Sequence, residues 1–130
     1  DIAFKKPITE KEVIEKFLPE ECSISYINRP SYYSECGFVG YNLRLWETKV
    51  FVKRFLQMYT SLALINEEEW HDSFIFDRVR EKMINEFKIK CYNLSPTIRK
   101  VGNPWIDTPM SEYMDHLKGK ARKDAGEMLK

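Results

Sequence analysis

The segment Glu35-Cys36-Gly37-Phe38-Val39-Gly40-Tyr41-Asn42-Leu43 is the clearest guide to the fold. Its apolar run predicts a buried strand. Two glycines inside a strand are costly unless another backbone or a ligand must come close. From Trp46 to about Leu62 the apolar spacing changes to that of a helix. A strand that leads into a helix is typical of α/β proteins.

The same alternation extends to both sides of this segment. Further strands are expected at about 1–4, 22–27 and 88–94, and further helices at about 9–17 and 66–87. A capping box formed by Thr9 and Glu12 favours a helix start at Thr9. The acidic run after Asn66 favours another start there, since the helix dipole stabilises acids in the first turn. The expected fold class is α/β, with a short mixed sheet flanked by helices.

Two helical stripes are expected to form the core. Both have apolar side chains at the spacing of one helix face. Thr48 is expected to cap the first of these helices. The first stripe contains Val50 or Phe51, Phe55, Met58 and Leu62, and the second contains Ile75, Val79 and Met83, with Trp70 and Phe74 beside it.

Composition limits the class of protein. The 130 residues suit one compact domain, and a chain that is 43% hydrophobic can bury a core. With 21 basic and 20 acidic residues, the chain lacks the basic excess of a general nucleic-acid binder, so no nucleic-acid partner is indicated. No apolar run approaches the roughly 18 residues of a membrane span.

Cysteine usage points to a reducing compartment. Cys22, Cys36 and Cys91 are an odd number and widely spaced, which predicts free thiols and a cytoplasmic protein. No CxxC pair is present, so a cysteine zinc site is not expected. The chain lacks a signal peptide and opens on Asp1 without a methionine, so we expect it to be part of a longer protein.

The late segment from Tyr113 to Lys123 has the residue types of a metal and phosphate site. His116 follows a carboxylate, and a histidine beside a carboxylate can bind a divalent metal. Gly119 lies among several cations, and such a segment can wrap a phosphate. Together these features suggest a nucleotide-type substrate. The alternative is a solvated basic tail.

Three further residues are candidates for chemistry. His71 and Asp72 are adjacent near a helix start and point in different directions, so they are not a ready-made dyad, although either could line a cleft. The alternative is a surface histidine and a capping aspartate. Glu35 precedes the strand that contains two glycines. The alternative interpretation of Glu35 is a solvated carboxylate in a loop. No GxSxG, P-loop or GxGxxG pattern is present.

Taken in order, four blocks resemble the C-terminal part of a GT-A-fold, nucleotide-sugar-dependent glycosyltransferase. The blocks are Asp1-Ile2, Glu35 to Leu43, Trp70-His71-Asp72-Ser73 and Tyr113 to Gly119. They are similar to those of a group of uncharacterised bacterial and phage proteins placed among such transferases. The resemblance implies one incomplete GT-A domain over residues 1–130, which lacks the N-terminal half that holds most of the nucleotide.

The resemblance also implies a metal site at the two ends of the chain. Asp1 is similar to the last aspartate of the DxD motif that binds a divalent metal, usually Mn²⁺ or otherwise Mg²⁺. His116, Gly119 and Arg122 have the spacing of the His-x-x-Gly-x-x-Lys segment of family 8 glycosyltransferases, with arginine replacing lysine. The proline and tryptophan that often follow in that family are missing. Lys118 or Arg122 would contact the diphosphate, and the two ends should meet.

The implied sugar site uses the middle of the chain. Glu35 and Gly37 are similar to an acidic residue and a glycine that lie near the sugar. Asp72 is similar to an acid that contacts donor or acceptor or acts as base, with His71 beside it as a substrate contact. The implied donor is a UDP- or GDP-sugar, and the acceptor is an unknown glycan or other molecule. The alternatives are a non-catalytic α/β interaction domain or degenerate relative, and a phosphate- or nucleotide-processing enzyme of another type.

Overall fold

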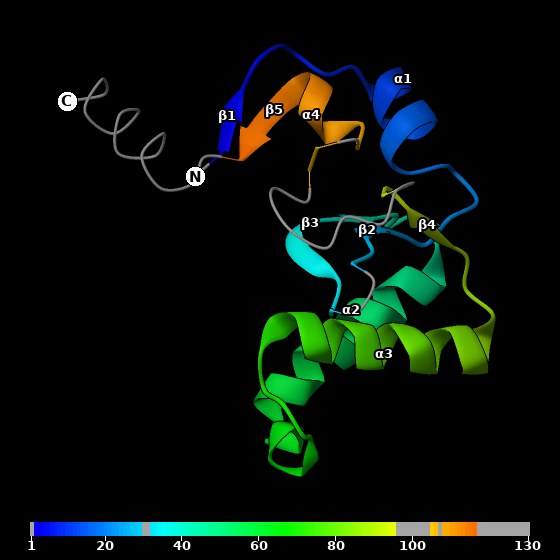
Figure 1. Ribbon diagram of the computed structural model, residues 1–130. Coiled ribbons are helices and arrows are strands. Elements are labelled where there is room, and N and C mark those ends of the chain that lie inside the picture. The colour runs from blue at the N-terminus through cyan, green and yellow to red at the C-terminus, as the bar shows by residue number, and fades with distance from the viewer. Residues whose placement is uncertain (1, 30–31, 96–104, 107, 117–130) are drawn as a thin grey trace.

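The computed structural model describes residues 2–29, 32–95, 105–106 and 108–116 (Figure 1). Strands and helices are interspersed along these ranges, as expected for an α/β protein. The elements are β1 (Ile2–Phe4), α1 (Glu10–Glu12), η1 (Val13–Phe17, π-helical), β2 (Ile24–Ile27), β3 (Glu35–Tyr41), α2 (Trp46–Thr60), η2 (Ala63–Asn66, 3₁₀), α3 (Asp72–Phe87), β4 (Cys91–Asn93), α4 (Met110–Tyr113) and β5 (Met114–His116).

The central sheet has the order β3-β2-β4. Strand β2 runs antiparallel to β3 and parallel to β4, so the sheet is mixed. The irregular stretch between Ser25 and Ile27 shifts the β2–β3 register. Helices flank this sheet, which confirms the expectation of a small α/β protein with a short mixed sheet. Within the described residues, a second sheet consists of β1 and β5.

Two layers enclose the central sheet (Figure 1). Helices α2 and α3 lie on one side, and α1, α4 and the β1–β5 pair lie on the other. The odd spacing of Ile24 and Ile27 in β2 places their side chains on opposite faces of the sheet. Both are fully buried, Ile24 in the α2/α3 core and Ile27 in the second core.

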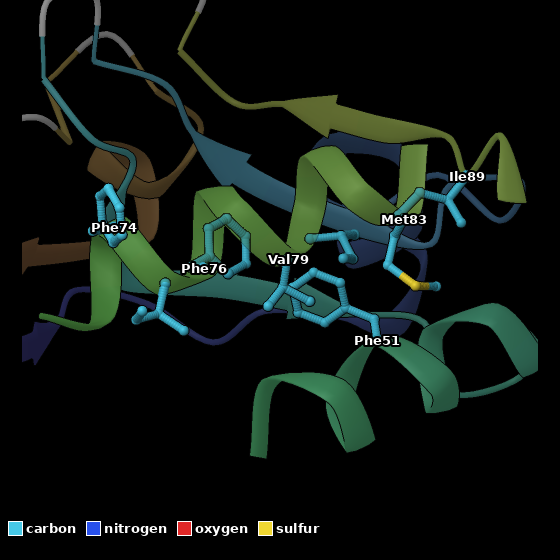
Figure 2. Packing of buried hydrophobic residues seen from close by; sticks show 8 residues of the cluster. Phe51, Phe74, Phe76, Val79, Met83 and Ile89 are labelled. Carbon is cyan, nitrogen blue, oxygen red and sulfur yellow. The ribbon is translucent and has the colours of Figure 1, made fainter. Parts of the chain in front are cut away.

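The α2/α3 core confirms most of the predicted helical stripes (Figure 2). Phe51 of α2 meets Phe76 of α3 edge to face, with 5.5 Å between ring centroids. Val79 and Met83 continue the stripe and are buried. Burying a side chain of this size contributes about 1.5–3 kcal/mol. The stripe therefore fixes α3 against α2 and the sheet.

Two residues predicted for the core are instead exposed. Leu62 is 68% exposed because α2 ends at Thr60 and Leu62 takes a left-handed conformation (φ 58°). Trp70 is 63% exposed because it precedes the first turn of α3. The expectation that these two side chains face the core was wrong.

The helix starts also differ from expectation. Helix α3 begins at Asp72, not near Asn66, and His71 is its N-cap. Glu67 forms an ion pair with Arg78 and lies before the helix, not in its first turn. Thr48 does not cap α2: it is buried and donates a hydrogen bond to the Ser23 carbonyl, at 3.2 Å. This hydrogen bond links the first turn of α2 to the residue that precedes β2.

The first helical segment confirms the predicted capping box. The Thr9 hydroxyl accepts a hydrogen bond from the Glu12 N–H, and the Glu12 carboxylate accepts one from the Thr9 N–H. The same carboxylate accepts a hydrogen bond from the buried Tyr113 hydroxyl, at 2.8 Å. Lys16 donates to that hydroxyl at 2.5 Å. The cap thus also joins η1 to α4.

No helix in the described part of the chain is long and apolar enough to cross a bilayer.

Candidate functional site

The beginning of the described chain lies beside His116. Strands β1 and β5 are antiparallel, with Ile2 opposite His116 and Phe4 opposite Met114. The Lys5 N–H extends the pairing with a 2.8 Å hydrogen bond to the Tyr113 carbonyl. The two ends of the described part of the chain are therefore adjacent, with Ile2 opposite His116. Asp1, Lys118, Gly119 and Arg122 lie outside the described residues.

His116 is held by a buried indole. Its ring stacks on Trp105, with 5.0 Å between centroids and 29° between planes. Trp105 is only 1% exposed, so the stack fixes one side of the half-buried imidazole. Asp115 precedes His116 in the strand and projects to the other face. It is exposed and pairs with Lys5 at 2.8 Å, so it does not act together with the imidazole.

The chemistry of these side chains permits a metal role for His116. A neutral imidazole is a common ligand for divalent metals, and carboxylates complete many such sites. No group of three or more His, Cys, Asp or Glu side chains gathers within the described ranges. His116 would therefore contribute one ligand to a set that needs carboxylates such as Asp1.

A cavity at the edge of the central sheet brings together two of the predicted sugar-site residues. It has a volume of about 390 Å³. Gly37 comes from β3, which is an edge strand, and Asp72 is the first residue of α3. The remaining lining residues are Cys36, Phe38, Val39, Tyr41, Phe55 and Phe76.

Among the described residues that line this cavity, only Asp72 has a charged side chain. Its Oδ1 accepts a 2.8 Å hydrogen bond from the Ser73 N–H, which orients the carboxylate at the helix start. Burial raises the pKa of Cys36 to about 11, so its thiol stays protonated at neutral pH and is not a nucleophile there. Burial likewise raises the pKa of Tyr41 to about 12. Asp72 is therefore the candidate base or hydrogen-bond acceptor.

Glu35 and His71 do not line the cavity, and both have structural partners. Glu35 pairs with Arg29 at 3.2 Å and accepts a hydrogen bond from the Gly37 N–H. The Nδ1 atom of His71 accepts the Phe74 N–H at 3.2 Å, and Nε2 lies 2.6 Å from Glu69. Both nitrogens of His71 thus hold the start of α3. The structure does not bring Glu35 or His71 together with Asp72 around the cavity.

The lining suits a ligand with an apolar face and hydroxyl groups. Tyr41 and Phe55 are partly exposed and offer aromatic surface, and Asp72 offers a carboxylate. Sugars combine apolar C–H faces with hydroxyl donors, and small-molecule sites are often apolar with a few polar groups. Of these aromatic residues, Phe55 was expected to face the core. Its place in the cavity wall depends on β3 being an edge strand, which no local pattern encodes.

Two other cavities contain none of the predicted site residues. One, of about 640 Å³, lies between η1 and the segment after β3 and includes Glu10 and Arg44. The other, of about 310 Å³, lies between α2 and α3 and includes Arg78 and Lys82. The first of these cavities is larger than the β3 edge cavity. Neither of the two, however, is lined by Asp72 together with aromatic side chains of α2 and β3. The β3 edge cavity is therefore the better candidate.

Comparison of the chain with protein-family models, curated proteins and solved structures finds no match. The functional argument thus depends on the residues and their geometry.

Proposed function

We propose that the protein is a metal-dependent glycosyltransferase that transfers a sugar from a UDP- or GDP-sugar to an acceptor hydroxyl. The observation that carries the proposal is the β1–β5 pair. It places His116 opposite Ile2, the residue that follows the expected metal ligand Asp1. In this proposal Asp1 would lie near His116, because it directly precedes Ile2 in the sequence.

In this proposal the two sites have separate roles. His116, kept in place by Trp105, would hold a metal together with Asp1. A bound Mn²⁺ or Mg²⁺ would supply positive charge to the diphosphate leaving group. Lys118, Gly119 and Arg122 would contact the same diphosphate. These assignments make the chain ends the donor side of the site.

The β3 edge cavity would hold a sugar ring. Tyr41 and Phe55 would pack against its apolar face, and Gly37 would leave room at one wall because it has no side chain. The Asp72 carboxylate, oriented by the Ser73 N–H, would accept a hydrogen bond or a proton from an acceptor hydroxyl through its second oxygen. Glu35 would support this wall through its bonds to Arg29 and Gly37.

A binding screen tests the proposal. The full-length protein would be titrated with UDP- and GDP-sugars in MnCl₂ and again with excess EDTA, with protein NMR signals as the readout. We expect at least one nucleotide sugar to change protein NMR signals in the presence of Mn²⁺, or of Mg²⁺ as its diamagnetic substitute. Excess EDTA should abolish the change. Absence of any shift across the set, together with no release of UDP or GDP, would refute the proposal.

A further inference from the structure

Helix α2 carries a second apolar stripe that faces solvent. Val52, Leu56 and Tyr59 have i, i+4, i+7 spacing, so they lie along one side of the helix. Their exposed fractions are 39%, 60% and 38%. The stripe continues beyond the helix at Leu62 (68%) and Ile65 (65%). These five residues are called the α2 tip surface below.

The α2 tip surface is distinct from the core stripe of the same helix. Phe51 is fully buried, and Phe55 and Met58 pack against the α2/α3 core. The end of α2 and the green segment after it project beyond α3, away from the central sheet (Figure 1). A protruding apolar surface of this kind usually marks an interaction site.

The charges around the α2 tip surface indicate the chemistry of its partner. From Thr48 to Asn66 the sequence contains Lys49, Lys53 and Arg54 and no acid. Both lysines are exposed, whereas Arg54 pairs with Glu86 at 2.6 Å. Apolar side chains beside exposed lysines complement an anionic lipid surface, where the chains enter the headgroup boundary and the lysines contact phosphates.

Of the three acids that follow, Glu67 and Glu69 have partners within the protein, and Glu68 is exposed. Glu67 pairs with Arg78 at 3.5 Å. Glu69 accepts a hydrogen bond from the Tyr33 hydroxyl and contacts His71. Partnered acids repel an anionic surface less than free ones do. The surface also adjoins the candidate cavity, because the Tyr59 ring lies 5.5 Å from Phe55, which lines it.

We propose that the α2 tip surface docks the protein on an anionic membrane, with Leu56, Leu62 and Ile65 in the headgroup boundary and Lys49 and Lys53 on lipid phosphates. This docking is peripheral and independent of the proposed sugar transfer. It would place the β3 edge cavity next to the membrane surface.

Vesicle flotation tests this inference without metal or nucleotide sugar, so its outcome is separate from that of the transferase proposal. The full-length protein would be mixed with vesicles of phosphatidylcholine alone or with 30% phosphatidylglycerol. We expect binding to the anionic vesicles that weakens in high salt. Lys49→Gln and Lys53→Gln should each reduce affinity about fivefold, and Leu56→Gln with Ile65→Gln should reduce it more.

Matched controls use equally exposed residues elsewhere. Leu43 is 57% exposed and Lys11 is exposed, and neither belongs to the α2 tip surface. Leu43→Gln and Lys11→Gln should bind as the wild type does. No wild-type binding to anionic vesicles would overturn the inference, and so would equal losses in controls and tip variants. A dimer in light scattering that Leu56→Gln dissociates would also overturn it, because the surface would then be a self-association interface.

Discussion

Ile2 and His116 lie opposite each other in the antiparallel β1–β5 pair, although they come from opposite ends of the described chain. This pairing turns two weak sequence signals into one spatial arrangement. The Trp105 ring stacks on the His116 ring, and the Lys5 N–H extends the pairing to the Tyr113 carbonyl of α4. The proposed metal site depends on this pairing.

The first prediction concerns the acid in the β3 edge cavity. Asp72→Asn keeps an oxygen that can accept the Ser73 N–H but removes the charge. If Asp72 acts as base, turnover should fall by about 100-fold or more, while donor affinity changes less than about twofold. Steady-state kinetics and a donor titration measure the two quantities. Unchanged turnover would remove Asp72 from the mechanism.

His71 should contribute to stability as a helix cap. His71→Ala removes the acceptor of the Phe74 N–H and should cost about 1 kcal/mol in the free energy of unfolding. His71→Asn supplies another capping oxygen and should recover most of that loss. Urea unfolding measures both. An alanine variant as stable as the wild type would contradict the capping role, and an asparagine variant that is stable but inactive would give the ring a second role.

Gly40 and Gly37 should respond differently to alanine. A Cβ at Gly40 would lie 2.4 Å from the Oγ of Ser25, which is fully buried. Gly40→Ala should therefore destabilise the protein by about 1–3 kcal/mol. At Gly37 the nearest atom is the Glu35 Oε1 at 3.0 Å, the end of a flexible side chain, so the cost should be smaller.

A double variant makes the Gly40 prediction specific. The Ser25 Oγ is buried and has no hydrogen-bond partner in the described part of the protein. Ser25→Ala should be neutral or stabilising, because it removes an unsatisfied polar atom. In the Gly40→Ala background it should recover much of the lost stability. Purely additive effects in thermal unfolding would show that the Ser25 contact is not the cause.

Protonation of Glu12 should lower the free energy of unfolding in acid. Hydrogen bonds from the Thr9 N–H, the Tyr113 hydroxyl and the Thr9 hydroxyl lower the pKa of Glu12 from 4.5 to about 2. A carboxyl that is more acidic when folded adds stability above its unfolded pKa and loses it as the pH falls through the folded pKa. The urea midpoint should therefore drop between pH 5 and pH 2.

A substitution at Glu12 shows how much of the acid-induced decrease in the urea midpoint comes from this carboxylate. Glu12→Gln should show a shallower loss of the urea midpoint on acidification than the wild type. Glu15→Gln is the control, because Glu15 is exposed and its ion pair with Lys11 is 3.6 Å long. Identical pH profiles for wild type and Glu12→Gln would contradict the assignment. Lysine contacts also lower the pKa of Glu112, so some pH dependence should persist in either variant.

Local features of the fold could be predicted from the sequence. The Thr9–Glu12 capping box involves neighbours, and the stripe through Val79 and Met83 follows helical period. The start of α3 was missed because acids after Asn66 mimic a first helical turn, whereas His71, an uncommon cap, provides the real one.

Long-range features of the site were less accessible. The convergence of the chain ends was expected only through a resemblance, and no pattern in either strand specifies the Ile2–His116 register. The aromatic walls of the cavity follow from the position of β3 at the sheet edge. Short-range periodicity identifies Phe55 as an apolar helix position but does not distinguish a core position from a cavity wall.

The most direct test of the metal assignment is Mn²⁺ binding in the presence of UDP or GDP, followed by electron paramagnetic resonance of free Mn²⁺. The full-length wild-type protein should bind the ion, and His116→Ala should weaken its affinity at least about tenfold, within the range expected for loss of a metal ligand or its support. Asp115→Asn, a change in the neighbouring residue that pairs with Lys5, should leave the affinity unchanged. Equal Mn²⁺ affinity in wild type and His116→Ala would contradict the account.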